Sequence, residues 1–177
     1  MKSRPLTKKD FKFKNLTKTE TTIVLAHLLV SLTFWTIYKF DLIPTENLKA
    51  WVSGYYFLVP FAVIGLFFRY LRNFKFYLAW LIISIGQLTV YFMVDGLTDF
   101  FYPRGTAFSG LKALLPTLIL FQLFRVILLK TQGRELIVTM RRGRFTMWEE
   151  EDNRNMTWVE VMFSLLLGGT IVIFNVV

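Results

Sequence analysis

The sequence has no cysteine and only one histidine, His27, among its 177 residues. The absence of thiols excludes disulfides, thiolate metal sites and cysteine nucleophiles. A single histidine is also too little for an ordinary zinc or haem site. We therefore predict no metal site and no cofactor, and we assign no catalytic residue.

Charged residues are also scarce, and they gather between long apolar stretches. Only 19% of the residues are charged, 54% are hydrophobic, and the mean hydropathy is +0.47. Five stretches are long enough to cross the roughly 30 Å hydrocarbon core of a bilayer as helices. They cover residues 21–38, 48–68, 76–94, 111–129 and 157–177. We predict an all-α, polytopic membrane helix bundle with five transmembrane helices.

The charged segments divide the chain into four parts. These are a basic tail (1–20), four transmembrane helices (21–129), a connection with basic and acidic runs (130–156) and the fifth transmembrane helix (157–177). The first span is too long for a signal-peptide core and no small-residue cleavage pattern follows it, so we expect a retained anchor. For residues 135–148 in the connection, a short hairpin and an interfacial helix both fit the pattern.

The distribution of basic residues predicts the orientation in the membrane. With the N-terminus in the cytoplasm, 17 of the 21 Lys and Arg residues fall on the cytoplasmic side. Only Lys39, Lys49, Arg104 and Lys112 fall outside. The positive-inside rule therefore favours a cytoplasmic N-terminus and an external C-terminus. We expect the bacterial inner (plasma) membrane.

Many of the cytoplasmic basic residues lie next to predicted spans, where they can contact anionic lipid headgroups. Each Lys or Arg near such a surface contributes about 1 kcal/mol to membrane binding. The net charge of +9 therefore needs no nucleic-acid partner. The predicted headgroup contacts are Lys8, Lys9, Lys12, Lys14, Arg69, Arg72, Lys75, Arg141, Arg142 and Arg144.

Two spans open with a capping-box pattern, a threonine followed three residues later by a glutamate. The pairs are Thr17 with Glu20 and Thr157 with Glu160. In this motif the threonine oxygen accepts an amide hydrogen bond while the glutamate binds the threonine amide. The pattern predicts that helices begin at these two places.

Polar residues inside the spans are functional candidates, because burying an ionisable group in hydrocarbon costs about 2.5–3.5 kcal/mol. His27, Gln122, Arg125 and Glu160 share the cytoplasmic half of the predicted bilayer and could form one polar cluster. In one hypothesis Arg125 pairs with Glu160 near His27, as a site for a proton, an anion or a lipid headgroup. We favour the alternative, in which Arg125 extends to the interface, Glu160 completes its capping box and His27 makes a structural hydrogen bond.

On the predicted outer side, Asp95 and Asp99 lie four residues apart around Gly96. Asp95-Gly96 resembles the start of the metal-binding signature of the phospholipid-making alcohol phosphotransferases, whose Ala-Arg pair and second pair of aspartates are absent here. A solvated loop, with the aspartates capping or pairing with Arg104, is the favoured interpretation.

The last span carries small residues at a spacing typical of helix packing. Ser164 and Gly168 lie four residues apart and Gly169 follows. Small residues let two helix backbones approach closely, so we predict a packing face here, with a partner inside the chain or in a second protein.

Three classes of function remain open. We favour a non-catalytic accessory or assembly subunit of a larger membrane complex, whose partners are membrane lipids and other membrane subunits or a second copy of the chain. The alternative is a small oligomeric transporter or channel that uses His27, Gln87 and Arg125. A third is a metal-dependent lipid-modifying enzyme that uses Asp95 and Asp99.

Overall fold

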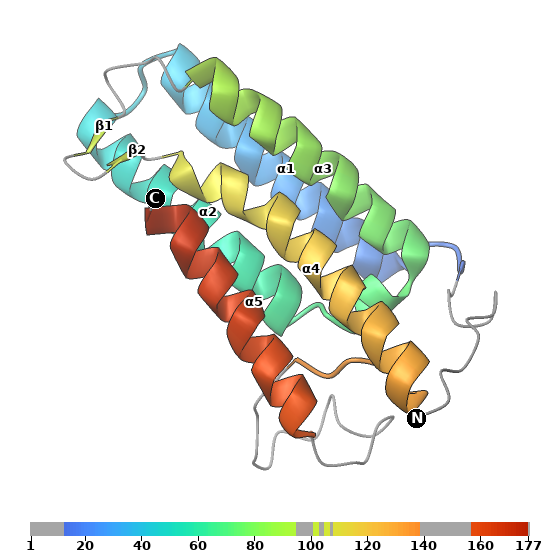
Figure 1. Ribbon diagram of the computed structural model, residues 1–177. Helices are drawn as coiled ribbons and strands as arrows, with labels where there is room; N and C mark the ends of the chain where they lie inside the picture. Colours follow the sequence, from blue (N-terminus) through green and yellow to red (C-terminus); the bar gives the residue numbers. More distant parts are fainter. Residues whose placement is uncertain (1–12, 95–100, 103–104, 107, 139–156, 177) are drawn as a thin grey trace, which may run out of the picture.

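The computed structural model describes residues 13–94, 101–102, 105–106, 108–138 and 157–176 (Figure 1). Its long helices are α1 (Lys18–Lys39), α2 (Thr45–Gly65), α3 (Phe74–Val94), α4 (Ser109–Gln132) and α5 (Trp158–Val176). All five are long and apolar enough to cross a membrane. The structure confirms the all-α fold and the five predicted spans, and the protein is a multi-pass membrane protein.

Three short elements accompany the helices in the described part of the chain. The 3-10 turn η2 (Tyr70–Arg72) lies between α2 and α3. Strands β1 (Phe101–Tyr102) and β2 (Gly105–Thr106) pair antiparallel, with Phe101 opposite Thr106. This small ladder lies at the end of the bundle where α3 ends and α4 begins (Figure 1).

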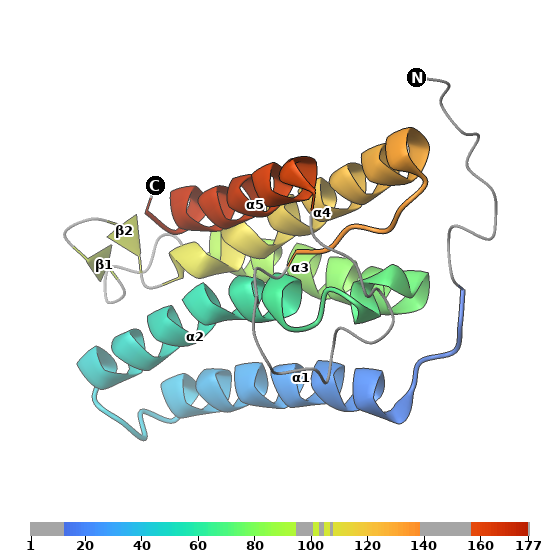
Figure 2. The same ribbon diagram turned by 90° about the horizontal axis from the view of Figure 1, so that it is seen from below.

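Successive helices run in opposite directions, so α1 begins at one end of the bundle and α5 finishes at the other (Figure 1). Helix α4 is central and packs against α2, α3 and α5. Helix α1 packs on α2 and α3, on the face of the bundle away from α5 (Figure 2). We call the end where α1, α3 and α5 begin the basic end, because Arg69, Arg72 and Lys75 lie there.

Large side chains fill the interior between α2, α3 and α4. Trp80 and Phe76 of α3 and Phe121 of α4 are at most 2% exposed, and Leu167 of α5 joins the same core. A second apolar cluster around Tyr56 and Leu111 lies toward the opposite end.

The outer faces of the bundle are as apolar as its core. Leu29 and Leu32 of α1 are 63% and 61% exposed, and Leu165 and Ile173 of α5 are 56% and 60% exposed. In water such a surface would be an aggregation liability. In a bilayer, it is the surface that a spanning helix presents to acyl chains.

Both predicted capping boxes are present. At α1, the Thr17 amide donates to Glu20 Oε2 at 2.7 Å and the Glu20 amide donates to Thr17 Oγ1 at 3.2 Å. At α5, the Thr157 amide donates to Glu160 Oε2 at 2.8 Å and the Glu160 amide to Thr157 Oγ1 at 3.4 Å. Local sequence therefore sets where these two helices begin.

The carboxylate of Glu20 also binds a residue outside its own helix. Its side chain is 3% exposed and accepts hydrogen bonds from Asn73 Nδ2 at 3.1 and 3.3 Å. The Asn73 side-chain oxygen in turn accepts from the Lys75 amide, in the first turn of α3. One shared carboxylate thus joins the start of α1 to the start of α3.

A close helix approach occurs at Gly110 of α4. A Cβ at this position would lie 2.6 Å from the carbonyl carbon of Tyr56 in α2 and 2.9 Å from Asn175 Oδ1 in α5. Only glycine fits such a contact without a shift of the helices. At Gly168 and Gly169, by contrast, a Cβ would meet no described atom within 4 Å outside its own helix turn. Ser164 Oγ donates to the Glu160 carbonyl in its own helix.

Candidate functional site at the basic end of the bundle

The chain leaving α4 turns back into the basic end of the bundle. Gly133 ends the helix with φ 67°, a left-handed conformation that glycine adopts without strain. Residues 134–138 that follow have no helical or strand structure. Leu136 and Val138 are 1% and 9% exposed and belong to the main core. We call residues 133–138 the strap.

A buried ion pair fixes the first part of the strap. Arg125 lies about two turns before the end of α4 and is fully buried. Its Nε donates to Glu135 Oε2 at 2.7 Å and its Nη2 donates to Glu135 Oε1 at 2.9 Å. The Glu135 side chain is 21% exposed. Two parallel, charge-assisted hydrogen bonds of this kind fix geometry as well as adding attraction.

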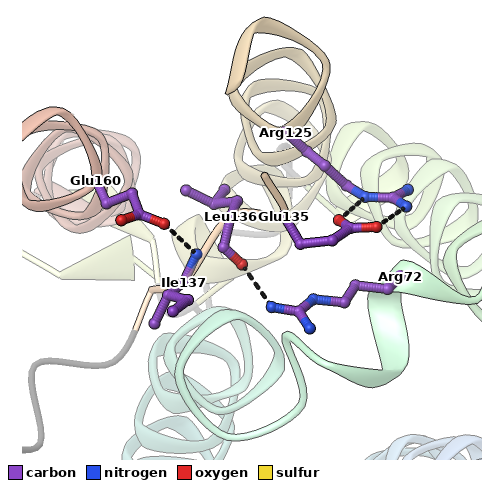
Figure 3. Close-up of polar contacts among 6 residues, drawn as sticks. All are labelled: Arg72, Arg125, Glu135, Leu136, Ile137 and Glu160. Carbon is purple, nitrogen blue, oxygen red and sulfur yellow. Dashed lines mark hydrogen bonds and ion pairs between the residues drawn. The ribbon is translucent and has the colours of Figure 1, made fainter. Parts of the chain in front are cut away.

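Two further charged side chains hold the backbone of the strap. Arg72 Nη2, from the turn before α3, donates to the Leu136 carbonyl at 3.1 Å. The Ile137 amide donates to Glu160 Oε1, from α5, at 3.3 Å (Figure 3). Both side chains are buried, Arg72 at 7% exposure and Glu160 at 0%. Side chains from three separate elements therefore converge on the strap.

Glu160 links the strap to the first turn of α5. Besides the Ile137 amide, its carboxylate accepts from the Thr157 amide and from Thr157 Oγ1, the latter at 3.0 Å. The buried carboxylate is thus surrounded by donors, which is the condition for keeping such a group in an apolar setting. As at Glu20, a capping residue also binds a neighbouring segment.

His27 belongs to a different site, within the bundle. Its Nδ1 lies 2.7 Å from the Tyr55 hydroxyl of α2, and its Nε2 lies 2.8 Å from Gln87 Nε2 of α3. With the Gln87 amide nitrogen as donor, His27 Nε2 accepts and Nδ1 carries the proton donated to Tyr55. The ring centroid of Trp80 lies 5.0 Å from that of His27. This hydrogen-bonded chain connects α1, α2 and α3.

The structure does not bring the four residues of the predicted polar cluster together at one site. His27 lies among α1, α2 and α3, whereas Arg125 and Glu160 lie on opposite sides of the strap (Figure 3). Gln122 is half-buried in α4, and its Oε1 has no hydrogen-bond partner among the described residues. The carboxylate that binds Arg125 comes from Glu135, ten residues further along the chain.

Sequence reasoning did not single out Glu135, Asn73 or Tyr55 as site residues. Glu135 is the first acidic residue after α4, two residues beyond a glycine that can reverse the chain. That combination is the one local signal for its position opposite Arg125. Asn73 and Tyr55 meet their partners 53 and 28 residues away in the sequence, where no local pattern applies.

The predicted lipid-contacting residues that the structure describes lie at the basic end. The guanidinium groups of Arg69 and Arg72 lie 6.0 and 5.6 Å from the centroid of the Phe68 ring. Lys75 Nζ donates to Asn15 Oδ1 at 2.7 Å, and Lys14 is exposed. The remaining ones lie outside the described residues: Lys8, Lys9, Lys12, Arg141, Arg142 and Arg144.

Within the described part of the chain, no group of three His, Asp or Glu residues could hold a metal ion. Asp95 and Asp99 lie outside that part. Comparison with protein families, with curated proteins and with solved structures finds no match for this chain.

Proposed function

We propose that this multi-pass membrane protein is a non-catalytic accessory or assembly subunit of a larger membrane complex, held against anionic lipid at its basic end. The observation that carries the proposal is the connection between α4 and α5. Its first residues form the strap, and Arg72, Arg125 and Glu160 are buried in holding it.

The connection is far longer than the link between α4 and α5 requires. These helices pack side by side, and neighbouring helices in bundles are commonly joined by about two to eight residues. Here the connection extends from Gly133 to Thr157. Connections of this length are generally functional or linkers, and the buried residues of the strap fix where this one begins. Its basic triplet Arg141, Arg142 and Arg144 and its acidic run 149–152 offer charged groups to a partner and to headgroups.

The glycine pair of α5 also supports a partner in the membrane. At Gly110 the contacts within the chain explain the absence of a side chain, because α2 and α5 lie against this position. Gly168 and Gly169, like the glycines of α2 and α3, have no such neighbour among the described residues, and each glycine inside a helix costs about 0.5–1 kcal/mol relative to alanine. The α5 pair differs from those other glycines in its spacing, because Gly168 follows Ser164 by four residues and Gly169 is adjacent. A second transmembrane helix packed on this face would account for both.

Copurification after mild detergent extraction tests the proposal. We expect the wild-type protein to elute with one or more membrane proteins at fixed stoichiometry, identified by mass spectrometry. The Gly168→Leu variant should lose or weaken this association. Gly86→Leu is the matched control, because Gly86 is an exposed glycine of α3 with no described neighbour within 4 Å.

A second pair of variants tests the connection. Replacing Arg141, Arg142 and Arg144 by glutamine should reduce copurification, whereas replacing Lys8, Lys9 and Lys12 by glutamine removes the same charge elsewhere and should preserve it. A monomer that elutes alone in all preparations would contradict the subunit proposal.

A further inference from the structure

We propose that the groove holding the strap is a peptide-binding site, occupied in cis by residues 133–138. The same groove would accept in trans an extended segment that carries a carboxylate followed by two aliphatic residues. This inference does not depend on the subunit role proposed above.

The contacts to the strap are those by which proteins recognise extended peptides. The groove binds a main-chain carbonyl at Leu136 through Arg72 and the next main-chain amide, at Ile137, through Glu160 (Figure 3). It also encloses the Leu136 side chain, which is 1% exposed. Main-chain hydrogen bonds combined with a side-chain pocket give affinity and specificity in peptide grooves generally.

The strap differs in structure from the walls of this groove. Residues 134–138 have no regular secondary structure, and Gly133 in its left-handed conformation provides a turning point where the strap begins. The walls are helices that also pack directly on one another, α2 on α4, α4 on α5 and α2 on α5. In the proposed open state these helix–helix contacts remain, and the core positions that Leu136 and Val138 fill are uncovered.

Arg125 determines the chemistry of an incoming ligand. Its guanidinium is fully buried and gives two hydrogen bonds to the Glu135 carboxylate. When the strap leaves, the Arg125 guanidinium loses these two hydrogen bonds but stays buried. Leaving a buried charge without its partner carboxylate is strongly unfavourable. Exchange with another carboxylate-bearing segment avoids that loss. Leu136 in the main core and Ile137 packed against that core select aliphatic residues at the two positions after the carboxylate.

The absence of cysteine from the chain allows a direct test of strap release. A Leu136→Cys variant should react slowly with a maleimide reagent in lipid nanodiscs, whereas Arg134→Cys, at an exposed position, should react readily. Adding Glu135→Gln to Leu136→Cys should raise the labelling rate about tenfold or more, the equivalent of losing charge-assisted hydrogen bonds. Glu46→Gln is the matched control, because Glu46 pairs with Lys49 at a position where its side chain is 81% exposed.

The trans ligand is tested with a fluorescent, end-blocked peptide of the sequence Arg-Glu-Leu-Ile-Val, which is that of residues 134–138. In zwitterionic nanodiscs it should bind the Glu135→Gln variant about tenfold more tightly than the wild type, whose groove is occupied. The same peptide with glutamine in place of glutamate should lose this binding. Equal binding of both peptides, or no rise in Leu136→Cys labelling, overturns the proposal.

A Leu136→Ala variant provides a second route, because it keeps the ion pair and weakens only the apolar anchor. It should also bind the peptide more tightly than the wild type does. If both Glu135→Gln and Leu136→Ala lose helical ellipticity and monodisperse elution, the strap is an inseparable part of the core and the proposal is wrong.

Discussion

Replacing Gly110 by alanine tests the close approach of α2, α4 and α5. The added Cβ would lie 2.6 Å from the Tyr56 carbonyl carbon and 2.7 Å from its oxygen, whereas ordinary van der Waals contact begins at 3.4 Å. The obstacle is helix backbone, which cannot rotate away as a side chain can. Helices α2 and α4 must therefore separate by most of an ångström, and we expect the free energy of unfolding to fall by about 1–3 kcal/mol.

Reversible unfolding in mixed micelles, titrated with SDS and followed by helical ellipticity, measures this loss. Gly54→Ala and Gly86→Ala serve as controls, since a Cβ at either position meets no described atom within 4 Å outside its own helix turn. These two variants should be unchanged or more stable by up to about 1 kcal/mol, because alanine favours the helix. Equal stability of Gly110→Ala and the controls would refute the packing on which the reasoning depends.

Two other predictions concern the interior and the orientation. His27→Leu and Gln87→Leu should each destabilise the bundle. Their double-mutant cycle should give a coupling energy of about 0.6 kcal/mol and at most about 1.7 kcal/mol, the mean and maximum for hydrogen bonds between membrane helices. Additive effects would show that the 2.8 Å contact contributes nothing. For orientation, a Leu42→Cys variant should react with an impermeant maleimide in intact cells, and Asn15→Cys only after permeabilisation, because the basic end is predicted to face the cytoplasm. The reverse pattern would invert the assignment.

The features that the sequence predicts well are those set by local chemistry. Hydropathy over about twenty residues locates each span, because a helix must satisfy its backbone within its own segment in a bilayer. The capping boxes at Thr17 and Thr157 are equally local, since threonine and glutamate meet within one helical turn. Neither feature needs any knowledge of which helices become neighbours.

Contacts between distant segments could not be predicted in the same way. The sequence favours an Arg125 that extends to the interface, with Glu160 as the alternative partner. The carboxylate that binds it belongs to Glu135, whose place depends on the reversal of the chain at Gly133. The small-residue spacing of α5 drew attention to Gly168, while Gly110, near the start of α4, is the glycine among those described that lies in close contact with other helices, α2 and α5. Glycine content indicates that backbones can approach, and only the arrangement of helices decides where they do.

The capping carboxylates Glu20 and Glu160 have a consequence for how the bundle assembles. Each one completes a helix terminus and at the same time binds a segment outside its own helix, Asn73 for Glu20 and Ile137 for Glu160. Fraying of the first turn of α1 or α5 and detachment of the bound segment are therefore coupled events. The first turn of α1 and the turn before α3 therefore open together, as do the first turn of α5 and the strap, which makes each of these two helix ends a small cooperative unit.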